Sequence, residues 1–248
     1  MTDAQILSLF PTPLYIINLE NELKPSEIKK LMKMETDKAN LLINERQNFF
    51  TRENDVLNKV LKPGSQLEYL FQLHVNYFVN EILGEGQAKL KMHLSWLNFN
   101  PPGSGHHKHV HPNSIVSGVF YLRTNEKSGN FNVHRGDGLR PMIRDQITNW
   151  NQFNYEYYFF TPKSYDLYLF PSSLSHSVDI NQSNETRASL SFNTFYEGEI
   201  RTDANGHLSS LNIGSITSGT NEERKKALGK DSSIGAGGSV KINNPIDK

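Results

Sequence analysis

The sequence predicts a mainly β protein in which helices back an antiparallel sandwich or jelly roll. Two observations indicate this class. The hydrophobic period changes from that of a helix to that of a strand at Leu90, and a series of strand candidates bounded by Pro, Gly, Asn or Ser follows up to residue 196. The 248 residues, 36% of them hydrophobic and 21% charged, are those of a soluble globular chain with room for one sizeable core.

The first sixty residues predict a small supporting segment. Prolines interrupt residues 10–14, and Ile28, Leu31 and Met32 recur at helical spacing after Pro25. We therefore expect an extended opening followed by a short helix.

Residues 65–84 carry the clearest helical pattern. Ser65 and Glu68 have the spacing of a capping box, and Gly84 can end the helix. We expect this helix to cover one sheet, with His74 as a hydrogen-bonded core residue rather than a ligand. The apolar stripe consists of Leu67, Leu70, Phe71, His74, Phe78 and Ile82.

From Leu90 the side chains alternate with period two. Leu90, Met92, Leu94 and Trp96 are expected on one face of a strand that ends at a Pro-Pro-Gly turn. Four further segments are rich in β-branched or aromatic residues, which favour strands. These predicted strands are residues 115–122, 157–161, 167–170 and 187–196.

The chain divides into three parts by composition. Residues 1–87 are predicted to support the same domain that residues 88–198 form as its β core. Residues 199–248 predict a low-complexity tail without a core of its own, a candidate segment for binding a protein partner. Residues 136–152 lack a clear period, and we expect them to form a mobile lid.

Charge and cysteine content exclude several classes of function. The 26 basic residues balance 26 acidic ones, so no global field attracts nucleic acid or anionic lipid. Because there is no cysteine, disulfides, thiolate nucleophiles, iron–sulfur clusters and sulfur-bound zinc are excluded. The opening resembles no secretory leader and no window has the length of an apolar membrane span, so we expect a cytoplasmic protein.

Four of the nine histidines fall within residues 106–111. Residues two apart point to the same side of an extended chain, so His109 and His111 can present two imidazoles to one ion. His176, just past a predicted strand, is the best candidate for a third ligand. His107 and His109 form a rival pair. Nitrogen ligands suit Fe(II), Zn, Cu or Ni, so the ligands alone do not choose the metal.

A second set of polar residues follows at the start of the last predicted strand. Arg187, Ser189, Ser191 and Asn193 share one face of that strand, opposite an apolar face. An arginine on an interior face is costly unless a carboxylate meets it, so its partner is expected to be a ligand. Tyr121 could add a phenolic hydrogen bond to the same carboxylate.

Four segments in this order, residues 109–114, 117–122, 170–176 and 187–193, resemble the family of 2-oxoglutarate- and Fe(II)-dependent oxygenases. The resemblance spans roughly residues 90–196. It implies a double-stranded β-helix and a dioxygenase that uses O2, Fe(II) and 2-oxoglutarate, with hydroxylation of an unknown substrate as the expected outcome. It also implies that iron is bound by His109, His111 and His176, and the distal carboxylate of 2-oxoglutarate by Arg187, Ser189 and Tyr121.

Some features depart from that pattern or leave alternatives open. The wider superfamily usually has a carboxylate where His111 stands, and a third imidazole changes the charge at the iron. Asp137 and Asp179 are not expected to be ligands. A zinc hydrolase using the three histidines is one alternative, although no general base is evident. A non-catalytic jelly-roll structural or binding protein is another, and exposed strand edges could pair into a homodimer.

Overall fold

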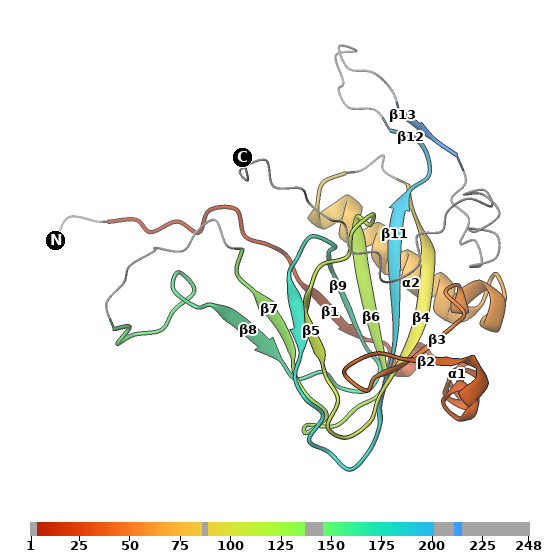
Figure 1. The fold of residues 1–248 in the computed structure, drawn as a ribbon. Helices are drawn as coiled ribbons and strands as arrows, with labels where there is room; N and C mark the ends of the chain where they lie inside the picture. Colours follow the sequence, from red (N-terminus) through yellow and green to blue (C-terminus); the bar gives the residue numbers. More distant parts are fainter. Residues whose placement is uncertain (1–3, 86–88, 137–145, 201–210, 215–248) are drawn as a thin grey trace, which may run out of the picture. The chain divides into compact units, whose positions relative to one another are not determined.

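The computed structural model describes residues 4–85, 89–136, 146–200 and 211–214. All of them lie in one compact unit, residues 1–216. No helix among these residues is long and apolar enough to cross a membrane. Within the unit, two antiparallel sheets are backed by helices on one side (Figure 1).

The major sheet has seven strands, and every pairing within it is antiparallel. The N-terminal segment contributes strands to both of its edges. In spatial order the strands are β1 (Tyr15–Asn18), β9 (Asp166–Pro171), β6 (Val116–Arg123), β11 (Arg187–Tyr196), β4 (Leu90–Asn100), β3 (Phe49–Thr51) and β2 (Leu41–Ile43).

The minor sheet has four strands, in the order β5 (His106–His109), β10 (His176–Val178), β7 (Phe131–His134) and β8 (Tyr157–Phe160). From β4 to β11 the chain passes back and forth between the two sheets, which is the winding of a jelly roll. The predicted fold class is confirmed. A separate hairpin joins β12 (Gly198–Ile200) to β13 (Leu211–Ile213).

Two α-helices supply most of the helical layer: α1 (Pro25–Lys33) and α2 (Gln66–Tyr77). Ser65 caps α2 by accepting a hydrogen bond from the Glu68 backbone N–H at 3.3 Å. The Glu68 carboxylate accepts from Gly64 rather than from Ser65, so the predicted capping box is shifted by one residue. A π-helical segment, η5 (Phe78–Ile82), continues α2. The remaining short helical turns are η1 (Glu20–Glu22), η2 (Met34–Thr36), η3 (Lys38–Asn40) and η4 (Leu57–Leu61).

The main core lies between α2 and the major sheet. Phe71 of α2 stacks on Phe192 of β11, with ring centroids 5.0 Å apart. Gly118 of β6 is paired with Phe192 and leaves space for its ring, since a Cβ there would lie 2.1 Å from a ring carbon. His74, as predicted, is a hydrogen-bonded residue of this layer: its Nδ1 lies 2.9 Å from the Tyr15 hydroxyl.

The prediction for the two faces of β4 is wrong in part. Leu90 and Met92 pack in the main core, but Leu97 and Phe99 join them there while Trp96 lines the cavity between the sheets. The cause is a β-bulge, since Asn193 pairs with Leu94 and the next residue of β11 pairs with Met92. The extra residue reverses the alternation of the side chains beyond it.

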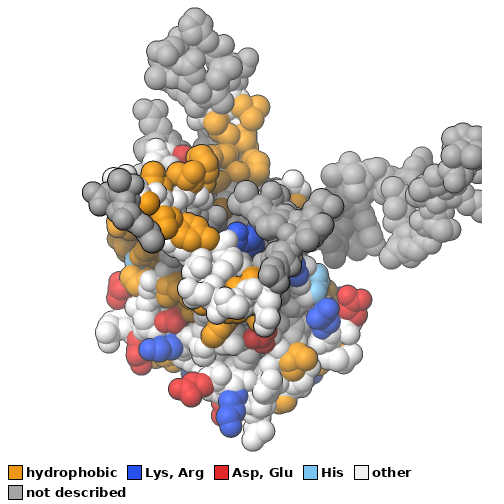
Figure 2. All heavy atoms as spheres, turned by 90° about the vertical axis from the view of Figure 1, so that its left-hand side faces the viewer, with side chains coloured by type: hydrophobic (Ala, Val, Ile, Leu, Met, Phe, Trp, Pro, Cys, Tyr) orange, Lys and Arg blue, Asp and Glu red, His pale blue; other side chains and the backbone are white. Residues whose placement is uncertain are grey.

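Strand β8 forms one edge of the minor sheet and carries exposed aromatic side chains. Tyr157 is 52% exposed and Phe159 is 64% exposed. Figure 2 shows hydrophobic side chains gathered on the side of the molecule that carries this strand. Residues 137–145 of the predicted lid lie outside the described residues, so that prediction stays open.

Candidate active site

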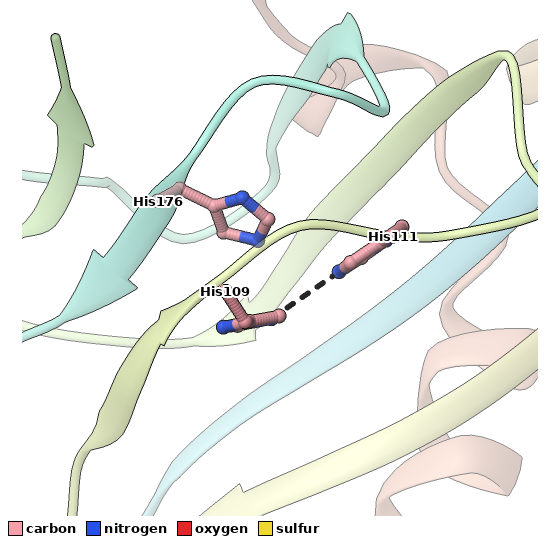
Figure 3. A group of neighbouring side chains, drawn as sticks. All are labelled: His109, His111 and His176. Atoms are coloured by element: carbon pink, nitrogen blue, oxygen red, sulfur yellow. Dashed lines mark hydrogen bonds between the residues drawn. The ribbon is translucent and has the colours of Figure 1, made fainter. Parts of the chain in front are cut away.

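Three histidines meet in the cavity between the two sheets (Figure 3). His109 ends β5 and His176 begins β10, and the two residues are directly paired in the minor sheet. His111 follows two residues after His109. The three ring centroids are 4.3, 4.9 and 5.2 Å apart. The i, i+2 spacing and the pairing of β5 with β10 therefore bring the three imidazoles to one place.

These histidines can hold a metal ion. One nitrogen from each lies within 4.8 Å of the others, and no other such group of His, Asp or Glu occurs among the described residues. The rival residue His107 is exposed and lies outside this group. Of the two registers left open by the sequence, the structure brings His109 and His111 together with His176.

Hydrogen bonds determine which nitrogen of each ring is available. The Nδ1 atoms of His109 and His176 lie 2.7 and 2.9 Å from the backbone oxygens of His107 and Leu174. A carbonyl oxygen accepts only, so each Nδ1 carries the proton and each Nε2 is free to coordinate.

The third ring has the same arrangement with side-chain partners. His111 Nδ1 lies 2.7 Å from Asn193 Oδ1, so its Nε2 also faces the centre of the group. That Nε2 is 3.3 Å from the Nε2 of His109. Two nitrogens without protons at this distance repel through their lone pairs, and a shared cation relieves the repulsion.

Burial keeps the three rings neutral. Desolvation lowers the pKa of His109 and His111 below the usual histidine value and lowers the pKa of His176 to about 3. Phe131 and Phe170 contribute to this environment, with ring centroids 5.4 and 4.8 Å from that of His176. Neutral imidazoles are the form that binds metal ions.

The same cavity contains a buried cation with unused donors. Arg187 is 2% exposed, and its Nη2 donates a 3.3 Å hydrogen bond to Asn100 Oδ1. Its Nε and Nη1 are buried and have no hydrogen-bond partner in the part of the chain that the structure describes. No Asp or Glu is among the described residues that line the cavity. A buried guanidinium with two free donors is suited to a planar anion such as a carboxylate.

Ser189 and Tyr121 line this end of the cavity with Arg187. The guanidinium carbon lies 6.0 Å from the centre of the Tyr121 ring. Burial raises the pKa of the Tyr121 phenol, so the hydroxyl stays protonated and can donate a hydrogen bond. These are the residues that the sequence grouped as candidate carboxylate ligands.

Sequence reasoning missed several cavity residues, including Trp96, Asn98 and His106. Asn98 donates a 3.0 Å hydrogen bond to Ser191 Oγ across the β4–β11 pair. Burial, followed by the charge of Arg187, lowers the pKa of His106 to about 3. Trp96 and Asn98 could not be predicted as cavity residues, because the bulge in β4 changes which face of the strand they lie on. His106 could have been predicted, since it lies only three residues before His109 in the same histidine cluster.

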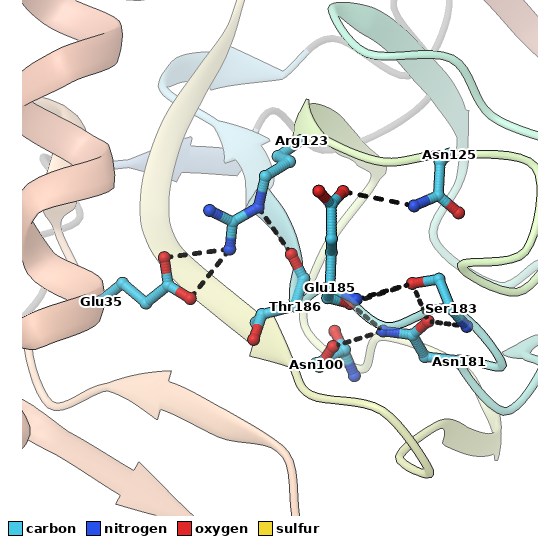
Figure 4. A network of polar contacts seen from close by, with 8 residues as sticks. All are labelled: Glu35, Asn100, Arg123, Asn125, Asn181, Ser183, Glu185 and Thr186. Atoms are coloured by element: carbon cyan, nitrogen blue, oxygen red, sulfur yellow. Dashed lines mark hydrogen bonds and ion pairs between the residues drawn. The ribbon is translucent and has the colours of Figure 1, made fainter.

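A polar network fixes the start of β11, where Arg187 stands (Figure 4). Arg123 donates to the backbone oxygen of Thr186 at 2.7 Å and pairs with Glu35 at 2.8 Å. Asn181 donates from its amide to the backbone oxygens of Asn100 and Glu185, both at 2.8 Å. The loop before Arg187 is thus tied to the ends of β6 and β4.

A family model described as "Putative 2OG-Fe(II) oxygenase" matches residues 94–193. This segment contains all three histidines and Arg187. The jelly-roll core is that of a 2OG-Fe(II) oxygenase. The protein is therefore an oxidoreductase whose cofactors are Fe(II) and 2-oxoglutarate, and the match leaves its substrate unspecified. No curated protein sequence matches the chain.

Solved structures of 2-oxoglutarate-dependent enzymes share the fold of this oxygenase. The carbocyclase SnoK from nogalamycin biosynthesis is 14% identical with a TM-score of 0.52, over 83% of this chain and 90% of that one. HygX from Streptomyces hygroscopicus, solved with nickel, 2-oxoglutarate and hygromycin B, is 13% identical with a TM-score of 0.51, over 83% and 94%. The epimerase SnoN is 11% identical with a TM-score of 0.53, over 84% and 91%.

The residues present fit both cofactors. Three neutral imidazoles with converging Nε2 atoms form a donor set suited to Fe(II). The unpartnered nitrogens of Arg187 suit the carboxylate of 2-oxoglutarate. Both features arise from this chain and do not depend on the likeness to other structures.

Proposed function

We propose that His109, His111 and His176 bind the iron of this oxygenase, and that Arg187, assisted by Ser189 and Tyr121, binds the distal carboxylate of 2-oxoglutarate. The reaction that we propose is hydroxylation of a substrate still to be identified. One observation carries the proposal: three metal-competent imidazoles line the same cavity as a buried guanidinium, two of whose nitrogens are unpartnered among the described residues.

The bound cofactors supply the oxidising chemistry, in which O2 is consumed while 2-oxoglutarate is converted to succinate and carbon dioxide. The chain supplies binding and orientation. Arg187 holds the cosubstrate at its far end by a charge-assisted pair, and the protonated phenol of Tyr121 donates to the same group. Phe131, Phe170 and Trp96 line the cavity and exclude water from it.

The three-histidine ligand set changes the charge of the site. A carboxylate in place of His111 would neutralise one positive charge of the metal, and a neutral imidazole does not. Among the described cavity residues, no acidic side chain makes up this difference. The negative charge of bound 2-oxoglutarate must therefore balance the positive charges of the metal and of Arg187. In a site with a carboxylate ligand, that ligand would balance part of this charge.

The alternatives have less support. A zinc hydrolase needs a general base near the metal, and the described cavity residues include no Asp or Glu. A non-catalytic jelly roll gives no reason for an unpartnered buried arginine. The family match favours the oxygenase over both.

Succinate release tests the proposal. Protein loaded with Fe(II) and 2-oxoglutarate in air should release succinate, and a member of a panel of amino acids, peptides, nucleosides and lipids should increase the rate and gain one oxygen atom. His176→Ala should lose the activity, whereas His107→Ala, a change in the exposed neighbouring histidine, should keep it. Equal succinate release by wild type and His176→Ala would contradict the ligand assignment.

Three other predictions concern partners and location. A homodimer is supported by the edge of β8, which pairs with no further described strand and carries the exposed Tyr157 and Phe159. Sedimentation of wild type and of Phe159→Lys would test it.

Binding of a protein partner by the tail concerns residues that are mostly outside the described part of the chain, and a cytoplasmic location awaits fractionation of cells.

A further inference from the structure

Several polar residues of the matched segment have no part in the proposed binding of iron or cosubstrate. Asn193, Ser117, Ser172 and Ser114 come from three strands and their connections, yet their side chains form one connected cluster beside His111. Asn193 and Ser117 are buried and directly paired between β11 and β6. Ser172 directly follows β9.

The contact with His111 Nδ1 is made by two oxygens of this cluster. Asn193 Oδ1 is 2.7 Å away and Ser117 Oγ is 2.9 Å away. The amide oxygen of Asn193 can only accept a hydrogen bond. The ring must therefore donate from Nδ1, which leaves Nε2 as the atom that faces His109 and His176.

The hydroxyl groups extend this arrangement. Ser114 donates to backbone oxygens of Val116 and Thr194, and Ser172 donates to Ser114 Oγ at 2.7 Å. Ser117 lies 2.7 Å from Ser172 Oγ and 2.8 Å from Asn193 Oδ1, so its proton has an acceptor on either side. The lone pairs of Ser117 are then free to accept from His111.

The other two histidines have backbone acceptors at Nδ1, which no side-chain substitution removes. His111 is the one whose tautomer depends on a side chain, and it stands where related enzymes usually have a carboxylate. A carboxylate has equivalent oxygens and no tautomer. A histidine at this position has two different nitrogens, and only one of its tautomers presents a lone pair to the metal.

We propose that Asn193, supported by Ser117, is a positioning residue that fixes the tautomer and orientation of His111 for metal binding. This inference rests on the proposed role of His111 as a ligand. Residues that hold the second nitrogen of a metal-binding histidine commonly change metal affinity by about 10- to 100-fold when they are replaced.

The test is a titration with Co(II) alone, followed by its visible absorption, with no turnover required. Asn193→Leu removes the hydrogen-bond acceptor and keeps a side chain of similar volume. Asn193→Ala also removes the acceptor, with a smaller side chain that cannot displace His111 by its size. Both should bind Co(II) about 10- to 100-fold more weakly than wild type. Asn193→Asp keeps an acceptor oxygen and should restore binding to at least the wild-type level.

Asn132→Leu is the matched control. Asn132 is 5% exposed compared with 7% for Asn193, and it has a side-chain partner, Asp179, at 2.6 Å, outside the histidine cluster. This variant should show a similar loss of thermal stability to Asn193→Leu and unchanged Co(II) affinity. Nitrogen NMR of the metal-free protein should show His111 protonated at Nδ1 in wild type and as a mixture of tautomers in Asn193→Leu.

The outcomes separate this inference from the proposed function. If His111→Ala binds Co(II) as tightly as wild type, the ligand assignment fails, and the positioning role fails with it. If His111→Ala loses binding while Asn193→Leu and Asn193→Ala bind like wild type, the ligand assignment stands and the positioning role is wrong. The role would also be contradicted if Asn193→Asp bound Co(II) as weakly as Asn193→Leu does. That result would mean that the acceptor oxygen at position 193 does not determine metal affinity.

Discussion

Arg187 has a buried environment that is unfavourable for a charged side chain without a ligand. Desolvation lowers the pKa of its guanidinium, and two of its nitrogens have no partner. Arg187→Met should weaken 2-oxoglutarate binding by about 30-fold or more, because removing one member of a buried charge pair costs ~2–5 kcal/mol. Calorimetric titration of the metal-loaded protein measures this change.

The same variant has a second expected result in the absence of cosubstrate. Unliganded Arg187→Met should be at least as stable as wild type, since it removes a buried charge that has no ion-pair partner among the described residues. Co(II) affinity should not fall, because Arg187 donates to none of the three histidines and its removal takes a positive charge out of the metal's cavity. A large loss of thermal stability in the unliganded variant would show that the guanidinium has a structural role instead.

His74 gives a prediction for pH. Burial lowers its pKa below the usual value near 6.5, so the unfolded chain binds more protons than the folded one below that pH. Its contribution to stability is present above about pH 6.5 and is lost as the pH falls. His74→Asn keeps an acceptor for the Tyr15 hydroxyl and does not titrate, so its stability should fall less steeply between pH 7 and pH 5 in urea unfolding. Parallel curves for the two proteins would contradict this.

At the residue scale, the sequence was most informative where residue type and spacing carry the chemistry. Histidines two apart, a later histidine and an arginine on a polar strand face identified the group that the structure brings together. The role of Asn193 could not be predicted, because a hydrogen bond over 82 positions depends on the pairing of β11 with β6. The fit of Trp96 into the cavity depends on a bulge that no residue pattern marked.

At the scale of elements, β6, β11 and α2 pack closely against one another in the core. A Cβ on Gly118 would lie 2.1 Å from the ring of Phe192, which is itself stacked on Phe71. Gly118→Ala should therefore destabilise the protein by about 1–3 kcal/mol through overpacking. Gly136→Ala is the control, since a Cβ there meets no described residue within 4 Å. Equal unfolding midpoints for both variants in urea would contradict this packing.

The long strands and the four-residue strand β8 were predicted, whereas the short strands β7 and β10 were not. Strands β4, β6, β9 and β11 have enough residues for an alternating or apolar pattern to be visible. Strands β7 and β10 have only four and three residues. Each of them forms because it pairs with a strand on either side in the minor sheet. A short segment of this kind carries too little local signal to distinguish it from a loop.

At the scale of the whole molecule, the proposed site depends on both sheets at once. The major sheet provides Arg187, Ser189 and Tyr121, whereas His109 and His176 come from the minor sheet. All of these residues lie between positions 109 and 189. A chain that ends at Ile216, the limit of the compact unit, should bind Co(II) and 2-oxoglutarate as the full chain does. Loss of either affinity on truncation would place part of the site in the tail.

The most direct test of the account is an anaerobic titration with Fe(II) and 2-oxoglutarate, monitored by visible absorption. The account predicts a charge-transfer band that requires both additions, is absent in His176→Ala, and needs far more 2-oxoglutarate in Arg187→Met. A protein that gives no band and has no affinity for 2-oxoglutarate would contradict the central claim that the histidines and Arg187 form one binding site.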